Sequence, residues 1–131
     1  MRQFFRLVTV YPVTTLCIVI IWVLCFCTPP KTPLEDVPLM DKWTHILMYA
    51  GTCSVMWIEH LRCRKHTARP GQLFPWAMLA MIFMGGAIEL LQAYCTAGRR
   101  SGDWFDFIAN TIGVLLGFLF GYIVYRAKYK G

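Results

Sequence analysis

Four long apolar runs, separated by short polar segments, dominate this chain of 131 residues. The runs cover about 8–27, 43–60, 73–95 and 104–125, and the first contains no charged residue. Runs of this length can cross the hydrocarbon core of a bilayer as α-helices. We therefore predict an all-α integral membrane protein, a four-helix bundle formed by a single domain over residues 1–131.

The segments between the runs support this division. Arg2 and Arg6 precede the first run in the manner of a signal peptide, but the run is longer than a signal core and no small-x-small cleavage site follows it. We therefore interpret it as a membrane helix. Four prolines follow in the next connection, and a Pro-Gly pair at positions 70 and 71 marks a turn before the third run.

Composition and charge narrow the class of protein. Hydrophobic residues make up 57% of the chain and charged residues 15%, which is more apolar surface than a water-soluble domain of this size can bury. The net charge of +6 does not indicate nucleic-acid binding, because the basic residues lie at the ends of the apolar runs. Of the 13 Lys and Arg residues, only Lys31, Lys42, Arg99 and Arg100 fall on the side opposite the termini. The positive-inside rule therefore places both termini in the cytoplasm.

With this topology, polar residues from three of the runs meet at the extracytoplasmic end. Asp41 and His45 open the second helix, and Glu89 lies near the end of the third. Glu89 and Asn110 are each about six residues from the end of their helix, or about 9 Å deep. A carboxylate at that depth needs a partner, a proton or a cavity, so we expect a functional role for Glu89.

Helical periodicity predicts which way these residues face. On the fourth helix, three polar residues share a stripe with three glycines, which are Asp103, Asp106, Asn110, Gly113, Gly117 and Gly121. Glycines at four-residue spacing allow another helix to approach closely, so this stripe is expected to face the bundle. His45 and Tyr49 share a stripe on the second helix, and Glu89 and Gln92 share one on the third.

Structural roles are open for several of these residues. Asp103 and Asp41 could cap helices, the glycines are expected to serve packing, and His45 could form a core hydrogen bond. Arg100 is a natural partner for Asp106, for Glu89 or for an incoming anion. Most of the six cysteines are interpreted as packing residues, and a disulfide between Cys27 and Cys95 stays open.

The order and spacing of these polar residues resemble the VanZ-like family of bacterial membrane proteins. The matching positions are Asp41, Lys42, His45, Tyr49, Glu89, Gln92, Arg100, Asp106, Asn110 and Gly113. The resemblance covers roughly residues 30–121. It implies a small multi-pass protein of the bacterial cytoplasmic (inner) membrane. The family's namesake confers low-level resistance to the glycopeptide teicoplanin, and no settled biochemical activity accompanies the family.

The leading hypothesis is an outer-leaflet site that binds or processes an anionic ligand. The ligand would be a lipid-linked envelope precursor or a lipoglycopeptide. Glu89, His45 and Asp106 are the candidate catalytic residues. The candidate ligand-binding residues are Asp41, Lys42, Tyr49, Gln92, Arg100, Asp103 and Asn110.

Two alternatives stand beside this hypothesis. The polar cluster could be a non-enzymatic surface for lipid, antibiotic or another envelope protein, since no serine or cysteine lies in a nucleophile motif. A divalent cation could be held by His45, Glu89 and one of the two aspartates, Asp103 or Asp106, although Arg100 nearby disfavours it and no cofactor is expected. Membrane lipids are the expected partners, and whether the site catalyses a reaction is left open.

Overall fold

A computed structural model describes residues 1–27, 33, 39–63, 70–97 and 102–129. These residues form five α-helices and no strand. The helices are α1 (Arg2–Val10), α2 (Pro12–Phe26), α3 (Met40–Cys63), α4 (Pro70–Cys95) and α5 (Trp104–Tyr129). The predicted all-helical fold class is confirmed.

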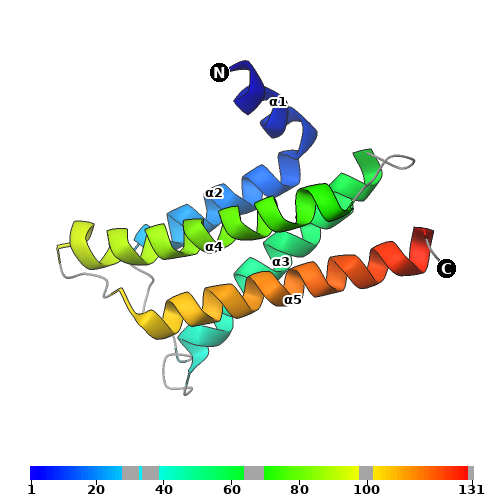
Figure 1. The fold of residues 1–131 in the computed structure, drawn as a ribbon. Coiled ribbons are helices and arrows are strands. Elements are labelled where there is room, and N and C mark those ends of the chain that lie inside the picture. Colours follow the sequence, from blue (N-terminus) through cyan, green and yellow to red (C-terminus); the bar gives the residue numbers. More distant parts are fainter. Residues whose placement is uncertain (28–32, 34–38, 64–69, 98–101, 130–131) are drawn as a thin grey trace.

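The predicted single helix over residues 8–27 is wrong, because α1 and α2 are separate helices that meet at an angle of 100°. The break falls at Tyr11, whose φ of −123° and ψ of 62° are not helical. Pro12 follows it as the first residue of α2. Proline has no N–H to continue the helix and restricts the residue before it, so the chain turns there. Figure 1 shows α1 projecting away from the other helices.

Two helical segments, Pro75–Cys95 and Trp104–Tyr129, are long and apolar enough to cross a membrane. The bent pair of α1 and α2 would be a third span if it crosses as one unit. α3 is not among these candidates, and it carries Asp41, Lys42, Glu59 and Arg62. The arrangement of four spans with cytoplasmic termini therefore stays a prediction.

The most extensive helix pairing is between α3 and α5, and glycines on α5 allow it. A Cβ atom on Gly113 would lie 2.6 Å from the carbonyl oxygen of Ile46, and one on Gly117 would lie 2.7 Å from that of Ala50. Gly121 lies against the ring of Trp57 in the same way. At these three positions the absence of a side chain lets α5 lie close to α3.

The core lies between the helices, and the outer faces are apolar as well. Buried side chains from α2, α3, α4 and α5 form one cluster, which includes Ile21, Tyr49, Cys53, Trp57, Ile88, Val114 and Phe118. Large apolar side chains such as Phe83, Leu119 and Phe120 remain exposed on the outside. This combination of a packed interior and an apolar exterior is expected of helices that contact lipid.

At the end of the molecule where α3 ends, a carboxylate from α3 caps α2. Glu59 accepts hydrogen bonds from the backbone N–H of Val13 and of Thr14, both at 2.9 Å, and from the Thr14 hydroxyl at 2.6 Å. The first N–H groups of a helix have no partner within the helix, and here Glu59 provides one. The Tyr11 hydroxyl also lies 2.8 Å from His60 Nδ1, which further ties the bend to α3.

Candidate functional site

The candidate site lies at the opposite end, where α3 begins, α4 ends and α5 begins (Figure 1). We use "polar cluster" for the seven residues that meet there, which are Asp41, Lys42, His45, Glu89, Asp103, Asp106 and Asn110. They include four of the seven acidic residues of the chain. His45, Glu89 and Asp106 are 5%, 7% and 6% exposed, so ionisable groups from three helices are buried together.

Helical spacing and the α3–α5 packing explain why the cluster forms. Asp41 and His45 are four residues apart on α3, and Asp106 and Asn110 are four apart on α5, so each pair lies on one helix face. Gly113 continues the α5 face inward and lets the backbones approach. The polar pair on α3 therefore packs against the polar pair on α5, near the first turn of each helix.

His45 is oriented by Asn110. Its Nδ1 lies 2.8 Å from Asn110 Oδ1, and Asn110 Nδ2 donates to Glu89 Oε1 at 3.3 Å. The amide oxygen of asparagine can only accept, so Nδ1 carries the hydrogen and donates. In the neutral ring this leaves the Nε2 lone pair free to act as a base or a ligand.

Glu89 fastens the end of α4 to the start of α5. Its Oε2 accepts a hydrogen bond from the backbone N–H of Asp103 at 3.3 Å, while Oε1 accepts from Asn110. Gly102 lies so close to the Glu89 carbonyl oxygen that a Cβ atom would not fit. The sequence did not draw attention to Gly102, although a glycine directly before the polar residues of a helix start is a recognisable sign of close approach.

Lys42 links the carboxylates on the open side of the cluster. Its ammonium donates to Asp103 Oδ2 at 3.0 Å and to Asp106 Oδ1, and lies 4.0 Å from Asp41 Oδ2. Burial by itself would lower the pKa of Lys42, but its hydrogen bonds to Asp106 and Asp103 raise the pKa above its ordinary value. Lys42 therefore stays charged and holds Asp106 in place.

Asp103 caps α5 and also contacts Lys42 in the polar cluster. Its Oδ1 accepts from the backbone N–H of Phe105 at 3.0 Å, which is the geometry of a helix N-cap at the start of α5. This hydrogen bond, followed by that from Lys42, lowers the pKa of the Asp103 carboxyl. The capping interpretation is confirmed, and the same carboxylate also belongs to the polar cluster.

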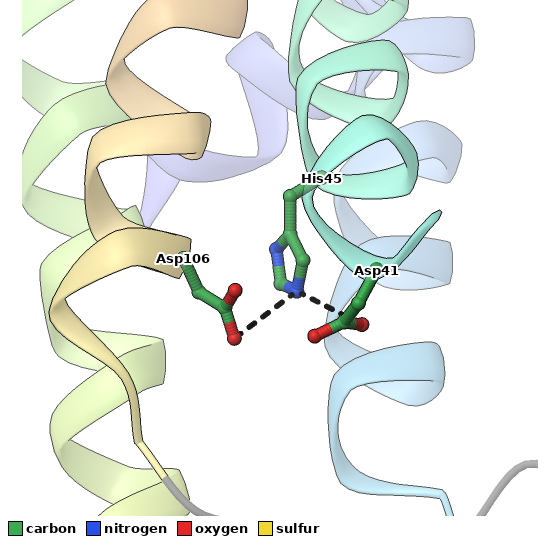
Figure 2. Close-up of side chains that lie close together, drawn as sticks. All are labelled: Asp41, His45 and Asp106. Carbon is green, nitrogen blue, oxygen red and sulfur yellow. Dashed lines mark ion pairs between the residues drawn. The ribbon is translucent and has the colours of Figure 1, made fainter. Parts of the chain in front are cut away.

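Asp41, His45 and Asp106 form a triangle of potential metal ligands. His45 Nε2 lies 3.9 Å from Asp41 Oδ1 and 3.9 Å from Asp106 Oδ2, and the three donor atoms lie within 4.8 Å of one another. Figure 2 shows the imidazole edge pointing between the two carboxylates. The cation set considered from the sequence contained Glu89, whereas the structure brings Asp41 to this triangle.

The remaining predicted site residues lie around the cluster or away from it. Tyr49 is fully buried, and its hydroxyl, which has no hydrogen-bond partner in the described part of the chain, lies near Gly85 and Asn110. Gln92 donates to the Cys25 carbonyl oxygen at 2.7 Å and so joins α4 to α2. Arg100 lies outside the described residues.

The cysteines do not contribute to the polar cluster. Cys27 and Cys95 are free thiols in the structure, and both are exposed. The Ser54 hydroxyl donates to the Ala50 carbonyl oxygen on its own helix. The chemistry that the described cluster offers is therefore carboxylate, imidazole, ammonium and amide chemistry.

These features define a helical membrane protein with a buried polar site at one end of its helices. The model of the VanZ/LLP1 family matches residues 37–125. The chain therefore belongs to the VanZ/LLP1 family, as the resemblance predicted. No curated protein and no solved structure gives a significant match.

Proposed function

We propose that this chain binds the anionic head group of a lipid-linked envelope molecule at the polar cluster. One observation carries the proposal, the burial of His45, Glu89 and Asp106 together at one end of the molecule. Ionisable side chains in a membrane-embedded bundle are costly, and they are retained where they serve a ligand or a proton path. A structural cap or a single core hydrogen bond would not require three buried ionisable groups from three helices.

The head group would enter from the open side of the cluster. Asp41 and Asp103 have side chains 64% and 40% exposed, whereas the Asp106 and His45 side chains behind them are 8% and 7% exposed. We place this opening on the extracytoplasmic side of a bacterial inner membrane, in agreement with the distribution of Lys and Arg. The exposed Trp43 and Trp104 near the same end suit the membrane interface.

Binding without covalent turnover fits the described cluster best, because it contains no serine or cysteine. Acid–base processing of the ligand is a second candidate. It is favoured by His45, whose Nδ1 is fixed by Asn110 while Nε2 faces the two carboxylates. In that case the Glu89 and Asp106 carboxylates would set the electrostatic environment of the imidazole. Tyr49 and Gln92 would pack beneath the polar cluster, toward the interior of the molecule.

Isosteric removal of charge tests the proposal. Glu89→Gln and Asp106→Asn variants should lose complementation of the deleted strain, measured as its teicoplanin susceptibility and its lipid-linked precursor profile. Glu59→Gln is the matched control, because it removes a carboxylate from the opposite end. If Glu89→Gln and Asp106→Asn complement fully at wild-type membrane levels, the polar cluster is not a functional site.

Native mass spectrometry of the protein purified in lipid nanodiscs separates the two candidates. Stoichiometric capture of a lipid of unchanged mass would support binding alone. Capture followed by a change in lipid mass that is lost in His45→Gln would support processing. Equal lipid capture by wild-type protein and Asp106→Asn would contradict both.

A further inference from the structure

We propose that Asp41, His45 and Asp106 bind one divalent first-row metal ion, Zn²⁺ or Mn²⁺, and that the anionic head group completes its coordination. The metal site stands on the geometry of the triangle alone. The role given to the head group rests on the function proposed above.

The spacing of the three donor atoms suits a metal after a small contraction. Zn–N and Zn–O bonds of about 2.1 Å in a tetrahedral site place neighbouring ligand atoms about 3.4 Å apart. The distances from His45 Nε2 to the two carboxylates, each 3.9 Å, exceed this by about 0.5 Å. Rotation of the exposed Asp41 side chain can shorten the Asp41–His45 distance without moving a helix, and a small rotation of the Asp106 carboxyl group can shorten the Asp106–His45 distance.

The atoms that would not bind the metal are already held. Asn110 accepts from His45 Nδ1, which fixes the ring with Nε2 toward the triangle. Lys42 occupies Asp106 Oδ1, which leaves Oδ2 facing His45. Hydrogen bonds of this kind to the far atoms of ligating histidines and carboxylates are a regular feature of metal sites.

The Nε2 atom of His45 is directed at the two carboxylates. It lies 3.9 Å from Asp41 Oδ1 and 3.9 Å from Asp106 Oδ2, which is longer than a hydrogen bond to either atom. His45 is 5% exposed, so the ring is buried with this nitrogen on the side of the triangle. A cation between Asp41 and Asp106 would contact Nε2 and both carboxylates (Figure 2).

Charge explains why a metal would help to bind an anion here. Within the described part of the polar cluster, Lys42 is the only lysine or arginine beside four carboxylic acids. Without a metal, an anionic head group would therefore meet mostly negative charge. A divalent ion held by three protein ligands would make the local charge positive, and it would keep a coordination position open for a phosphate or carboxylate oxygen.

The donor set selects the kind of metal. One imidazole with two carboxylates suits Zn²⁺ or Mn²⁺, whereas Ca²⁺ and Mg²⁺ prefer sites made only of oxygen. The competing arrangement is a protonated His45 paired with both aspartates and no metal. Titration of the metal alone distinguishes the two.

The test uses the full chain in nanodiscs, stripped with a chelator and titrated with Zn²⁺ and Mn²⁺. We expect one ion per chain by calorimetry, and a ¹⁴N coupling from imidazole in the Mn²⁺ electron spin echo spectrum. Affinity should fall at least about tenfold in Asp41→Asn, whose side chain is exposed enough to spare folding, and the ¹⁴N coupling should vanish in His45→Gln. His60→Gln, at the far end of α3, should keep both signals. The site would be overturned if the wild-type protein bound no stoichiometric metal ion. It would also be overturned if metal binding were unchanged in both Asp41→Asn and His45→Gln.

Lipid capture by the wild type with and without chelator separates this inference from the proposed function. Capture that requires the metal supports both. If the protein captures the same amount of lipid with and without chelator, and no metal is bound, the metal site is contradicted and the proposed function is still supported. If metal binding is weakened in the Asp41→Asn and His45→Gln variants as expected, but no anionic lipid is captured, the metal site is supported and the proposed function is contradicted.

Discussion

His45 Nδ1 and Asn110 Oδ1 lie 2.8 Å apart, although 65 residues separate them in the chain. This hydrogen bond joins α3 to α5, and the same Asn110 side chain donates a second hydrogen bond to Glu89 on α4. One buried amide therefore links three helices and sets the direction in which the imidazole faces.

Replacement of Asn110 should be costly. Asn110→Ala leaves the Nδ1–H of His45 without its acceptor and Glu89 without its side-chain donor, so we expect a loss of about 2–3 kcal/mol in the free energy of unfolding. Thermal unfolding in detergent measures the loss. Thr111→Ala is the control, because Thr111 only donates back to Phe107 on its own helix and should change stability by less than about 0.5 kcal/mol. Equal stability of the two variants would contradict this role for Asn110.

Gly117 should not tolerate even a methyl group. In Gly117→Ala the new Cβ would lie 2.7 Å from the Ala50 carbonyl oxygen and 2.5 Å from the Cβ of Cys53, so α3 and α5 must separate. We expect a loss of about 1–3 kcal/mol, measured by chemical denaturation in detergent. The matched variant Gly51→Ala has nothing within 4 Å of its new Cβ and should be neutral or more stable by up to about 1 kcal/mol. A tolerated Gly117→Ala would mean that the helices pack less closely than described.

Glu59 should stabilise the start of α2. In Glu59→Ala the backbone N–H groups of Val13 and Thr14 lose their acceptor, so these two amides should exchange hydrogen faster and the unfolding free energy should fall by about 1–2 kcal/mol. Hydrogen exchange measured by mass spectrometry reports on both amides. Ser54→Ala, whose hydroxyl bonds only within α3, should leave that exchange unchanged. Unchanged protection of residues 13–16 in Glu59→Ala would show that the cap is not needed.

The orientation in the membrane can be tested with two exposed cysteines at opposite ends. Cys95 ends α4 beside the polar cluster, and Cys63 ends α3 at the far end. With both termini in the cytoplasm, an impermeant maleimide should label a single-cysteine Cys95 protein in intact spheroplasts. The single-cysteine Cys63 protein should be labelled only after lysis. The reverse pattern would place the polar cluster on the cytoplasmic side.

Much of the site was visible in the sequence because it depends on helical periodicity. Asp106, Asn110 and Gly113 share a helix face wherever that helix forms, and a glycine stripe must face another backbone. The convergence of His45, Glu89 and Asp106 at one end followed from connecting the helices in order. The break at Pro12 was missed, because an uninterrupted apolar run outweighed a proline that is as compatible with a helix start as with a kink.

The sequence by itself determined the helical class, the membrane environment, the family and the faces on which the polar residues lie, since these follow from local composition and from the helical repeat. Only the tertiary structure decided which polar atoms touch. It paired Lys42 with Asp103 and Asp106, brought Asp106 to His45, and directed Gln92 to the backbone of α2. Such pairings depend on the rotation and depth at which helices pack. Those are set by side-chain volumes on several helices together, and no single segment contains that information.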